Sequence, residues 1–313
     1  MTLHSFSPIQ YIDDPALAAS GVELNILRLD RFFPPISGNK YFKLKHNVDY
    51  ARRHGYQRLL SFGGAYSNHI HALALAGRHY GFGTIGLIRG EQSMEANLNP
   101  TLQDAVDAGM DLHFLDRSQY RNKHDKDFVA RLQAEFSDAF IIPEGGSNLL
   151  GVKGCMEIVG HIQHHLDDNY DLVIVPCGTA ATLAGIAAAL PDNKQVVGVA
   201  VLKNAQFLND EVTAYLQQLG VAKDNWQILL DYHGGGYAKL NQSLAHFIQQ
   251  FEQANTLQIE PVYTGKMFYG LYDQLIHSAQ FKGKRIVAVH TGGLQGLRGI
   301  GDQLEKLQAK AVG

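Results

Sequence analysis

The chain has 313 residues, of which 45% are hydrophobic and 18% charged, and its formal net charge is -3 at pH 7. This composition is typical of a globular protein of about two domains and excludes the disordered and fibrous classes. Because the chain lacks a basic excess and any apolar run near the roughly 20 residues that span a bilayer, we expect it to bind neither nucleic acid nor a membrane.

The first residues and the cysteines indicate the compartment. Residues 1–21 contain no basic segment followed by a long apolar run, so we expect no signal peptide. The two cysteines, Cys155 and Cys177, have neither the number of a disulfide framework nor the spacing of a zinc site. These features predict a cytoplasmic protein with reduced thiols and no metal.

Short runs rich in β-branched and aromatic residues recur along the chain and predict strands. They cover residues 24–29, 58–62, 83–88, 111–115, 139–142, 171–176, 195–202, 226–230 and 285–290. Helical patterns lie between them, and such alternation predicts an α/β fold with open twisted parallel sheets covered by helices on both faces. Nine strands are many for one doubly wound sheet, so we expect two sheets.

Helical spacing of apolar residues predicts several of the covering helices. They lie over residues 41–53, 68–80, 149–166 and 240–251. The helix over 149–166 carries His161, His164 and His165 without a carboxylate or cysteine partner. We interpret these histidines as a solvated helix face rather than as a metal site.

Glycine clusters occur where strands lead into helices. They are Gly63-Gly64, Gly145-Gly146, Gly178 and Gly292-Gly293. Open α/β sheets bind ligands at the carboxyl ends of their strands, where such loops lie. Each cluster alone is explained by a tight turn, but together they predict one shared ligand cleft.

Lys40 is the candidate nucleophile. It follows Gly38 and Asn39 and opens the helix predicted over residues 41–53. The positive end of a helix lowers the pKa of a lysine there slightly, which favours the free amine that Schiff-base chemistry needs. Taken alone, the Asn-Lys pair is explained as well by a surface lysine after a turn.

Two strand–turn–helix segments have the features of anion sites. In residues 59–69, Ser67 or Asn68 caps a helix whose free N–H groups suit a carboxylate, although an ordinary N-cap explains the pair too. In residues 171–185, a buried strand leads into small residues and a helix. Backbone amides with the hydroxyls of Thr179 and Thr182 suit a phosphate there. The motifs of nucleoside triphosphate and dinucleotide sites are absent, which favours a cofactor phosphate.

Two tyrosines lie beside glycines and strand ends, where they can face a cleft or fill a core. Tyr237 follows the run 234–236 of three glycines, and Tyr263 precedes Thr264. Thr291 directly precedes the pair Gly292-Gly293.

Together these segments resemble the D-cysteine desulfhydrase and 1-aminocyclopropane-1-carboxylate (ACC) deaminase family. That family belongs to the tryptophan-synthase-β-like (fold type II) enzymes of pyridoxal 5'-phosphate (PLP). The matching segments, in order, are Gly38-Asn39-Lys40, Gly63-Gly64, Ser67-Asn68-His69, Pro143-Glu144-Gly145-Gly146-Ser147-Asn148, residues 179–182, Tyr237, Pro261-Val262-Tyr263-Thr264-Gly265-Lys266 and His290-Thr291-Gly292-Gly293. The resemblance implies a homodimer in which a small domain, residues 55–147, is inserted into a large PLP domain of residues 1–54 and 148–313.

The resemblance also implies roles for individual residues. Lys40 holds PLP covalently and then acts as the base at the substrate α-carbon. Asn68 donates to the phenolic oxygen of the cofactor and, with Ser67 and His69, binds the substrate. The remaining assignments are phosphate binding by Thr179, Ala180, Ala181 and Thr182, and catalytic contact with the substrate by Ser67, Tyr237 and Tyr263.

Two threonines distinguish the branches of the family. ACC deaminases have glutamate and leucine where this chain has Thr264 and Thr291. A carboxylate keeps the pyridine nitrogen protonated, whereas a threonine hydroxyl only hydrogen-bonds a neutral ring. A neutral ring suffices when thiolate leaves the β-carbon, so the threonines favour β-elimination, with D-cysteine giving pyruvate, ammonia and sulfide.

Several alternatives remain open. They are ACC deamination, a PLP-binding protein without that turnover, and a protein for another phosphorylated ligand in which Lys40 is incidental. Ser37, Phe42 and Lys45 replace a glycine, an arginine and a glutamate of the family pattern, so a different amino acid substrate is also compatible.

Overall fold

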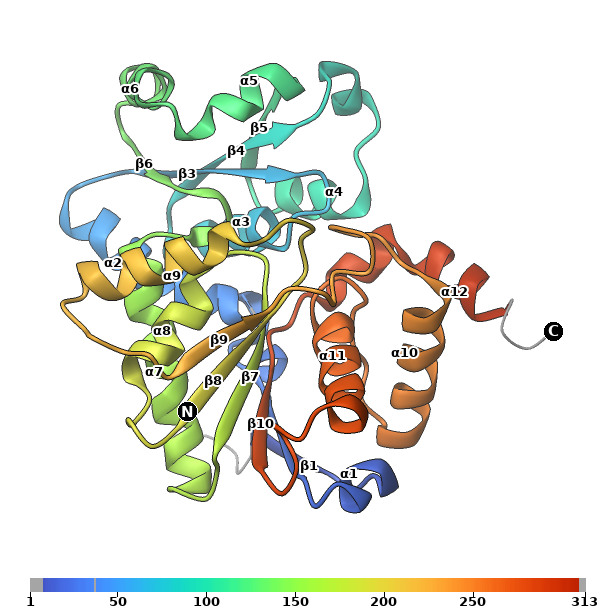
Figure 1. The fold of residues 1–313 in the computed structure, drawn as a ribbon. Coiled ribbons are helices and arrows are strands. Elements are labelled where there is room, and N and C mark those ends of the chain that lie inside the picture. The colour runs from blue at the N-terminus through green and yellow to red at the C-terminus, as the bar shows by residue number, and fades with distance from the viewer. Residues whose placement is uncertain (1–7, 37, 310–313) are drawn as a thin grey trace.

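The computed structural model describes residues 8–36 and 38–309, so Ser37 lies outside the described residues. Two sheets form the frame, one above the other in Figure 1. The larger has the order β1-β2-β10-β7-β8-β9 and the smaller the order β5-β4-β3-β6. The strands are β1 Ile9–Ile12, β2 Glu23–Arg28, β3 Arg58–Gly64, β4 Gly83–Arg89, β5 Met110–Leu115, β6 Ala139–Ile142, β7 Leu172–Cys177, β8 Gln195–Ala200, β9 Trp226–Leu229 and β10 Arg285–His290.

The nine expected strands are confirmed, and the two-sheet expectation with them. The addition is β1, which runs antiparallel to β2 at the edge of the larger sheet, whereas the other neighbours in both sheets are parallel. The smaller sheet is formed by strands between residues 58 and 142, inside the segment assigned to the small domain. The exact domain boundaries stay a prediction.

Helices cover both faces of the larger sheet because its central strands are apolar throughout (Figure 1). Val173 and Val175 of β7 pack with the helices of one face, and Leu172 and Ile174 pack with those of the other. The first face carries α2 Asn39–Arg53, α7 Leu149–Leu166, α8 Ala181–Ala189 and α9 Phe207–Gln218. The second carries α10 Gln242–Asn255 and α11 Thr264–His277, with α1 Pro15–Ala19 and α12 Gly301–Ala309 nearby.

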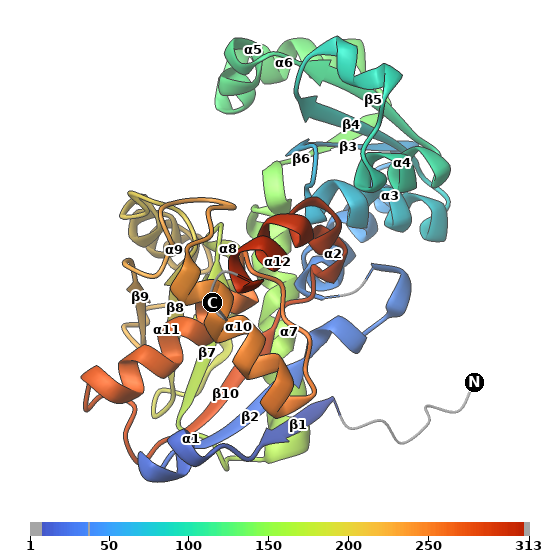
Figure 2. The ribbon, with the colours of Figure 1, turned by 90° about the vertical axis from the view of Figure 1, so that its right-hand side faces the viewer.

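The smaller sheet has the same layered construction. Leu59 of β3 packs toward α3 and α4, whereas Leu60 and Phe62 pack toward α5 and α6. These helices are α3 Asn68–Tyr80, α4 Pro100–Asp107, α5 Arg117–Arg121 and α6 Lys126–Glu135. Figure 2 shows α12 near the junction between the two sheets.

Three helices pack unusually closely through glycines. A Cβ atom at Gly154 of α7 would lie 1.8 Å from the carbonyl oxygen of Phe42 in α2. A Cβ atom at Gly185 of α8 would lie 2.6 Å from the carbonyl oxygen of Val152 in α7. This approach brings the beginnings of α2 and α8 together, where Asn39 Nδ2 donates to Thr182 Oγ1 at 3.0 Å. Among the described residues, no helix has the length and apolarity to cross a membrane.

Candidate functional site

A cavity of about 910 Å³ lies where the loops of the two sheets meet. That volume falls within the range of about 300–1,000 Å³ usual for small-molecule sites. Glycines of all four expected clusters line it, namely Gly64, Gly145, Gly178, Gly292 and Gly293. The expectation of one shared cleft is therefore confirmed.

Most of the residues assigned to the site lie at this cavity. Those that line it are Lys40, Ser67, Asn68, His69, Thr179, Thr182, Tyr237, Tyr263 and Thr291. Those that are fully buried and absent from the lining are Ala180, Ala181 and Thr264. The roles assigned to all of them stay predictions.

Lys40 is held at the cavity by the turn before it. Gly38 has a φ of +78°, and a Cβ atom there would lie 2.1 Å from the Thr291 carbonyl oxygen, so the turn requires glycine. Half-buried Lys40 donates from Nζ to Asn39 Oδ1 at 2.9 Å. Burial, with a contribution from neighbouring Lys43, lowers the pKa of Lys40 to about 7. Burial, more than the helix end, therefore favours the free amine.

Lys43 is a site residue that sequence reasoning missed. It is 2% exposed, and its Nζ donates to Thr179 Oγ1 at 2.9 Å and to the Gly145 carbonyl oxygen at 3.1 Å. Its partners are these two oxygens and no carboxylate among the described residues, and Ala180, the N-cap residue of α8, offers no side-chain cap. Burial lowers the pKa of Lys43, and a phosphate bound at this helix start would supply the anion that a lysine ammonium there lacks. The available signal was its position three residues after Lys40, on the same helix face.

The start of α3 combines a side-chain cap, Ser67, with the buried imidazole of His69. Ser67 Oγ accepts from the Ile70 N–H at 3.3 Å and so caps α3. His69 Nε2 lies 2.8 Å from Ser61 Oγ, which itself donates to the Ile142 carbonyl oxygen at 2.7 Å. Nε2 is therefore the donor, and Nδ1 is left as a buried acceptor without a partner. Burial, together with two nearby lysines, holds the pKa of His69 well below 6.5, so the ring is neutral.

Two tyrosines face each other at the cavity. Tyr263 Oη donates to Tyr237 Oη at 3.5 Å, and the ring centroids are 6.1 Å apart. A Cβ atom at Gly178 would lie 2.8 Å from the Tyr263 ring, so this glycine leaves room for it. Buried Lys266 donates to the Gly236 carbonyl oxygen at 2.8 Å and fixes the loop of Tyr237. Burial raises the pKa of Tyr263 well above 10, and partial desolvation raises that of Tyr237, which is 45% exposed, so both keep their protons near neutral pH.

Glu260 is a second residue that the sequence did not single out. It lines the cavity at 2% exposure and accepts from the backbone N–H groups of Val262, Tyr263 and Thr264 at 2.6–2.8 Å. Its own N–H donates to Thr264 Oγ1 at 3.0 Å. Burial raises the pKa of Glu260, and the three N–H groups oppose that rise. The carboxylate thus caps α11 and orders the turn of Tyr263.

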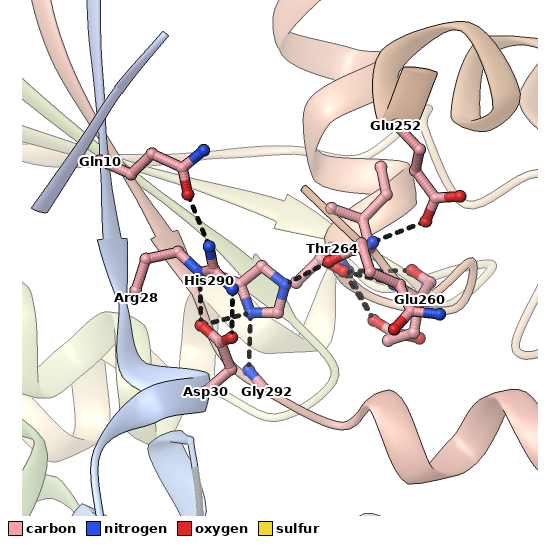
Figure 3. A network of polar contacts seen from close by, with 10 residues as sticks. Gln10, Arg28, Asp30, Glu252, Glu260, Thr264, His290 and Gly292 are labelled. Atoms are coloured by element: carbon pink, nitrogen blue, oxygen red, sulfur yellow. Dashed lines mark hydrogen bonds and ion pairs between the residues drawn. The ribbon is translucent and has the colours of Figure 1, made fainter. Parts of the chain in front are cut away.

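A buried polar network supports the loop that follows β10 (Figure 3). His290 Nε2 contacts the Gln258 carbonyl oxygen at 3.0 Å, and its Nδ1 lies 3.3 Å from Asp30 and accepts from Gly292 N. Arg28 donates to both oxygens of Asp30, at 2.8 and 2.6 Å. These contacts hold the backbone of Gly292 against the cavity.

The two described departures from the family pattern lie away from the cavity. Phe42 is fully buried, with its ring centroid 5.6 Å from that of His161. Lys45 pairs with Glu157 at 2.6 Å. The rings of Phe32 and Phe42 cover part of His161, whereas His164 and His165 are exposed, as expected of a solvated helix face.

Comparison with known proteins gives a consistent picture. A family profile described as "Pyridoxal-phosphate dependent enzyme" matches residues 6–292. The chain is 28% identical to the mitochondrial bifunctional D-cysteine desulfhydrase/1-aminocyclopropane-1-carboxylate deaminase of Arabidopsis thaliana, covering 97% of this chain and 80% of that protein. It is 28% identical to a D-cysteine desulfhydrase of Klebsiella pneumoniae, covering 93% and 92%. A crystal structure of an ACC deaminase homologue superposes with a TM-score of 0.82 at 27% identity, over 96% and 93% of the two chains.

Proposed function

The chain belongs to the pyridoxal-phosphate dependent enzymes, and on that premise we propose that it eliminates the β-substituent of a small amino acid, with D-cysteine preferred. The products are then pyruvate, ammonia and sulfide. The observation that carries the proposal is that Lys40, whose pKa burial lowers to about 7, lines one cavity with Lys43, which donates to Thr179 Oγ1 at 2.9 Å. Relatives named for D-cysteine desulfhydrase support the choice of substrate.

The residues present fit PLP. Lys43, Thr179 and the start of α8 offer positive charge and donors for the phosphate. Lys40 and Asn68 both line the cavity, where Lys40 would hold the cofactor and Asn68 would donate to its ring oxygen. When bound, PLP supplies an electron-accepting ring that stabilises charge developing at the substrate α-carbon.

The chain's own groups then bind the substrate and move its protons. Ser67, Asn68 and the N–H groups at the start of α3 bind the substrate carboxylate. Lys40 Nζ accepts the α-proton, because a pKa of about 7 leaves much of it as free amine at neutral pH. The carbon–sulfur bond breaks as the α-carbon electron pair forms the α,β double bond, and protonated Tyr263 or Tyr237 donates a hydrogen bond to the departing sulfur.

ACC deamination is the second candidate, favoured by the ACC deaminase homologue that the fold matches. A panel of D-cysteine, L-cysteine and ACC separates the two, with pyruvate and sulfide measured on PLP-loaded protein. We expect the highest kcat/KM with D-cysteine. Pyruvate from ACC with no sulfide from either cysteine would instead assign the deaminase. No turnover of any of the three by loaded protein would leave a PLP-binding protein without this activity.

Lys40→Ala is the accompanying test of attachment. Borohydride should fix the cofactor to the unaltered chain and not to the variant, because the substitution removes the attacking amine. Retention of the covalent cofactor by Lys40→Ala would assign another lysine to the attachment.

A cytoplasmic homodimer is the proposed state of the protein. Cys155 and Cys177 are buried free thiols, as in proteins of reducing compartments. The family resemblance supports the dimer, and sedimentation equilibrium measures it directly.

A further inference from the structure

Gln295 joins the two parts of the cavity wall. It lies in the 3₁₀ helix Leu294–Gly299, and its Nε2 donates to Asn68 Oδ1 at the start of α3. Its Oε1 accepts from Thr101 Oγ1 of α4 at 2.8 Å and from Arg298 Nη2 at 3.2 Å. Because a guanidinium only donates, Oε1 must face Arg298. The opposite end of the Gln295 amide, a donor, is thereby directed at Asn68.

This contact determines which end of the Asn68 amide faces the cavity. Since Oδ1 accepts from Gln295, Nδ2 is the end left over, and it has no acceptor among the described residues. A Cβ atom at Gly293 would lie 2.5 Å from Asn68 Nδ2, so the glycine keeps that space open. Asn68, Gly293 and Gln295 all line the cavity. Asn68 therefore offers a donor, not an acceptor, to a bound ligand.

We propose that Gln295 is a positioning residue that keeps Asn68 Nδ2 directed at the ring oxygen of the cofactor. The inference rests on the proposed function, in which Asn68 binds that oxygen. An ionised phenolic oxygen only accepts hydrogen bonds, so an Asn68 amide rotated by half a turn would repel it.

The same contact joins two segments of the cavity wall. Asn68 and Thr101 belong to the helices of the smaller sheet, whereas Gln295 belongs to the C-terminal segment. A second link, Arg298 Nη2 to Asp104 Oδ2 at 2.6 Å, joins the same two elements without touching Asn68. Asp104, which contacts neither Gln295 nor Asn68, is thus a matched control for this link alone.

Gln295→Glu tests the orientation with little change of shape. A carboxylate still accepts from Thr101 and Arg298 but gives Asn68 no donor, so the Asn68 amide must rotate. We expect PLP affinity, measured by fluorescence titration, to fall at least about tenfold. The pH midpoint of the bound cofactor's absorption should also shift, because the hydrogen bond to its ring oxygen is lost.

Asn68→Asp should reproduce that shift, since it replaces the same donor by an acceptor. The double variant of Gln295→Glu and Asn68→Asp should shift the midpoint little more than either single variant does. Asp104→Ala should leave the absorption midpoint unchanged, because it removes the link to Arg298 without touching Gln295 or Asn68. An unaltered midpoint and affinity in Gln295→Glu would overturn the role of Gln295, provided that the unaltered chain binds PLP. Failure of the unaltered chain to bind PLP would overturn the proposed function and this inference together.

Discussion

Lys43 and Lys45 lie two residues apart on α2 but face different surroundings. Lys43 contacts Thr179 in the cavity, whereas Lys45 pairs with Glu157 outside it. We expect Lys43→Met to weaken PLP binding at least about tenfold, because a charged hydrogen bond to the phosphate is lost. Lys45→Met serves as the control and should leave the dissociation constant unchanged. Equal affinities for both variants would remove Lys43 from the phosphate site.

The lowered pKa of Lys40 gives a pH dependence with a definite sign. Burial lowers this pKa from 10.5 to about 7, so the free amine forms as pH rises through about 7. The rate at which added PLP attaches to the cofactor-free protein should therefore increase with pH and level off above that midpoint. Stopped-flow absorbance measures it. A midpoint near the ordinary lysine pKa of 10.5 would contradict the buried environment of Lys40.

Sequence patterns found the residues that have a local signal and missed those that depend on distant partners. Lys40 was indicated by its place before a helix, supported by glycine loops further along the chain. Glu260 and Gln295 act through contacts with a helix start and with α3, so nothing next to them in the sequence marks them. The Thr264 hydroxyl accepts from the Glu260 N–H at 3.0 Å, a contact with no local sequence signal, and its role at the ring nitrogen stays a prediction.

At the scale of elements, the glycines between α2, α7 and α8 support the site. Gly154→Ala forces α7 away from α2, since its Cβ would lie 1.8 Å from the Phe42 carbonyl oxygen. We expect the free energy of unfolding to fall by about 1–3 kcal/mol, and PLP affinity to fall with it because α2 carries Lys40 and Lys43. Urea denaturation and cofactor titration check the two effects.

Gly160→Ala is the matched control in the same helix. A Cβ atom there meets nothing within 4 Å, so the substitution should raise the free energy of unfolding by about 0.5–1 kcal/mol through helix propensity alone. Destabilisation of equal size at both positions would contradict the close-packing account.

Nine of the ten strands in the described part of the chain follow from local composition, because buried parallel strands are continuous β-branched runs. The missed strand, β1, has four residues and pairs only with β2 at a sheet edge. Its short apolar pattern has no distinguishing period, so only the tertiary pairing defines it.

At the scale of the molecule, the cavity draws its walls from both sheets, so a ligand should stabilise them together. With free PLP at 100 times its dissociation constant, the free energy of unfolding should rise by about 2.7 kcal/mol. The single tryptophan, Trp226 in β9, reports the larger sheet by fluorescence, and hydrogen exchange in β3 and β4 reports the smaller. Bound PLP should shift the unfolding transition seen by Trp226 fluorescence to higher denaturant and should slow hydrogen exchange in β3 and β4. An effect confined to Trp226 would indicate that PLP contacts the larger sheet alone.

The pairing of β2 with β10 has a consequence for biosynthesis. Residues 23–28 lie between β1 and a strand made of residues 285–290, and the Asn39 N–H donates to the Thr291 carbonyl oxygen at 3.1 Å. A nascent chain still on the ribosome therefore has β2 exposed on one side and Lys40 without its supporting turn. We expect the vitamin-derived cofactor to be captured only after translation is nearly finished, and truncated chains to expose an unpaired strand edge to chaperones and proteases.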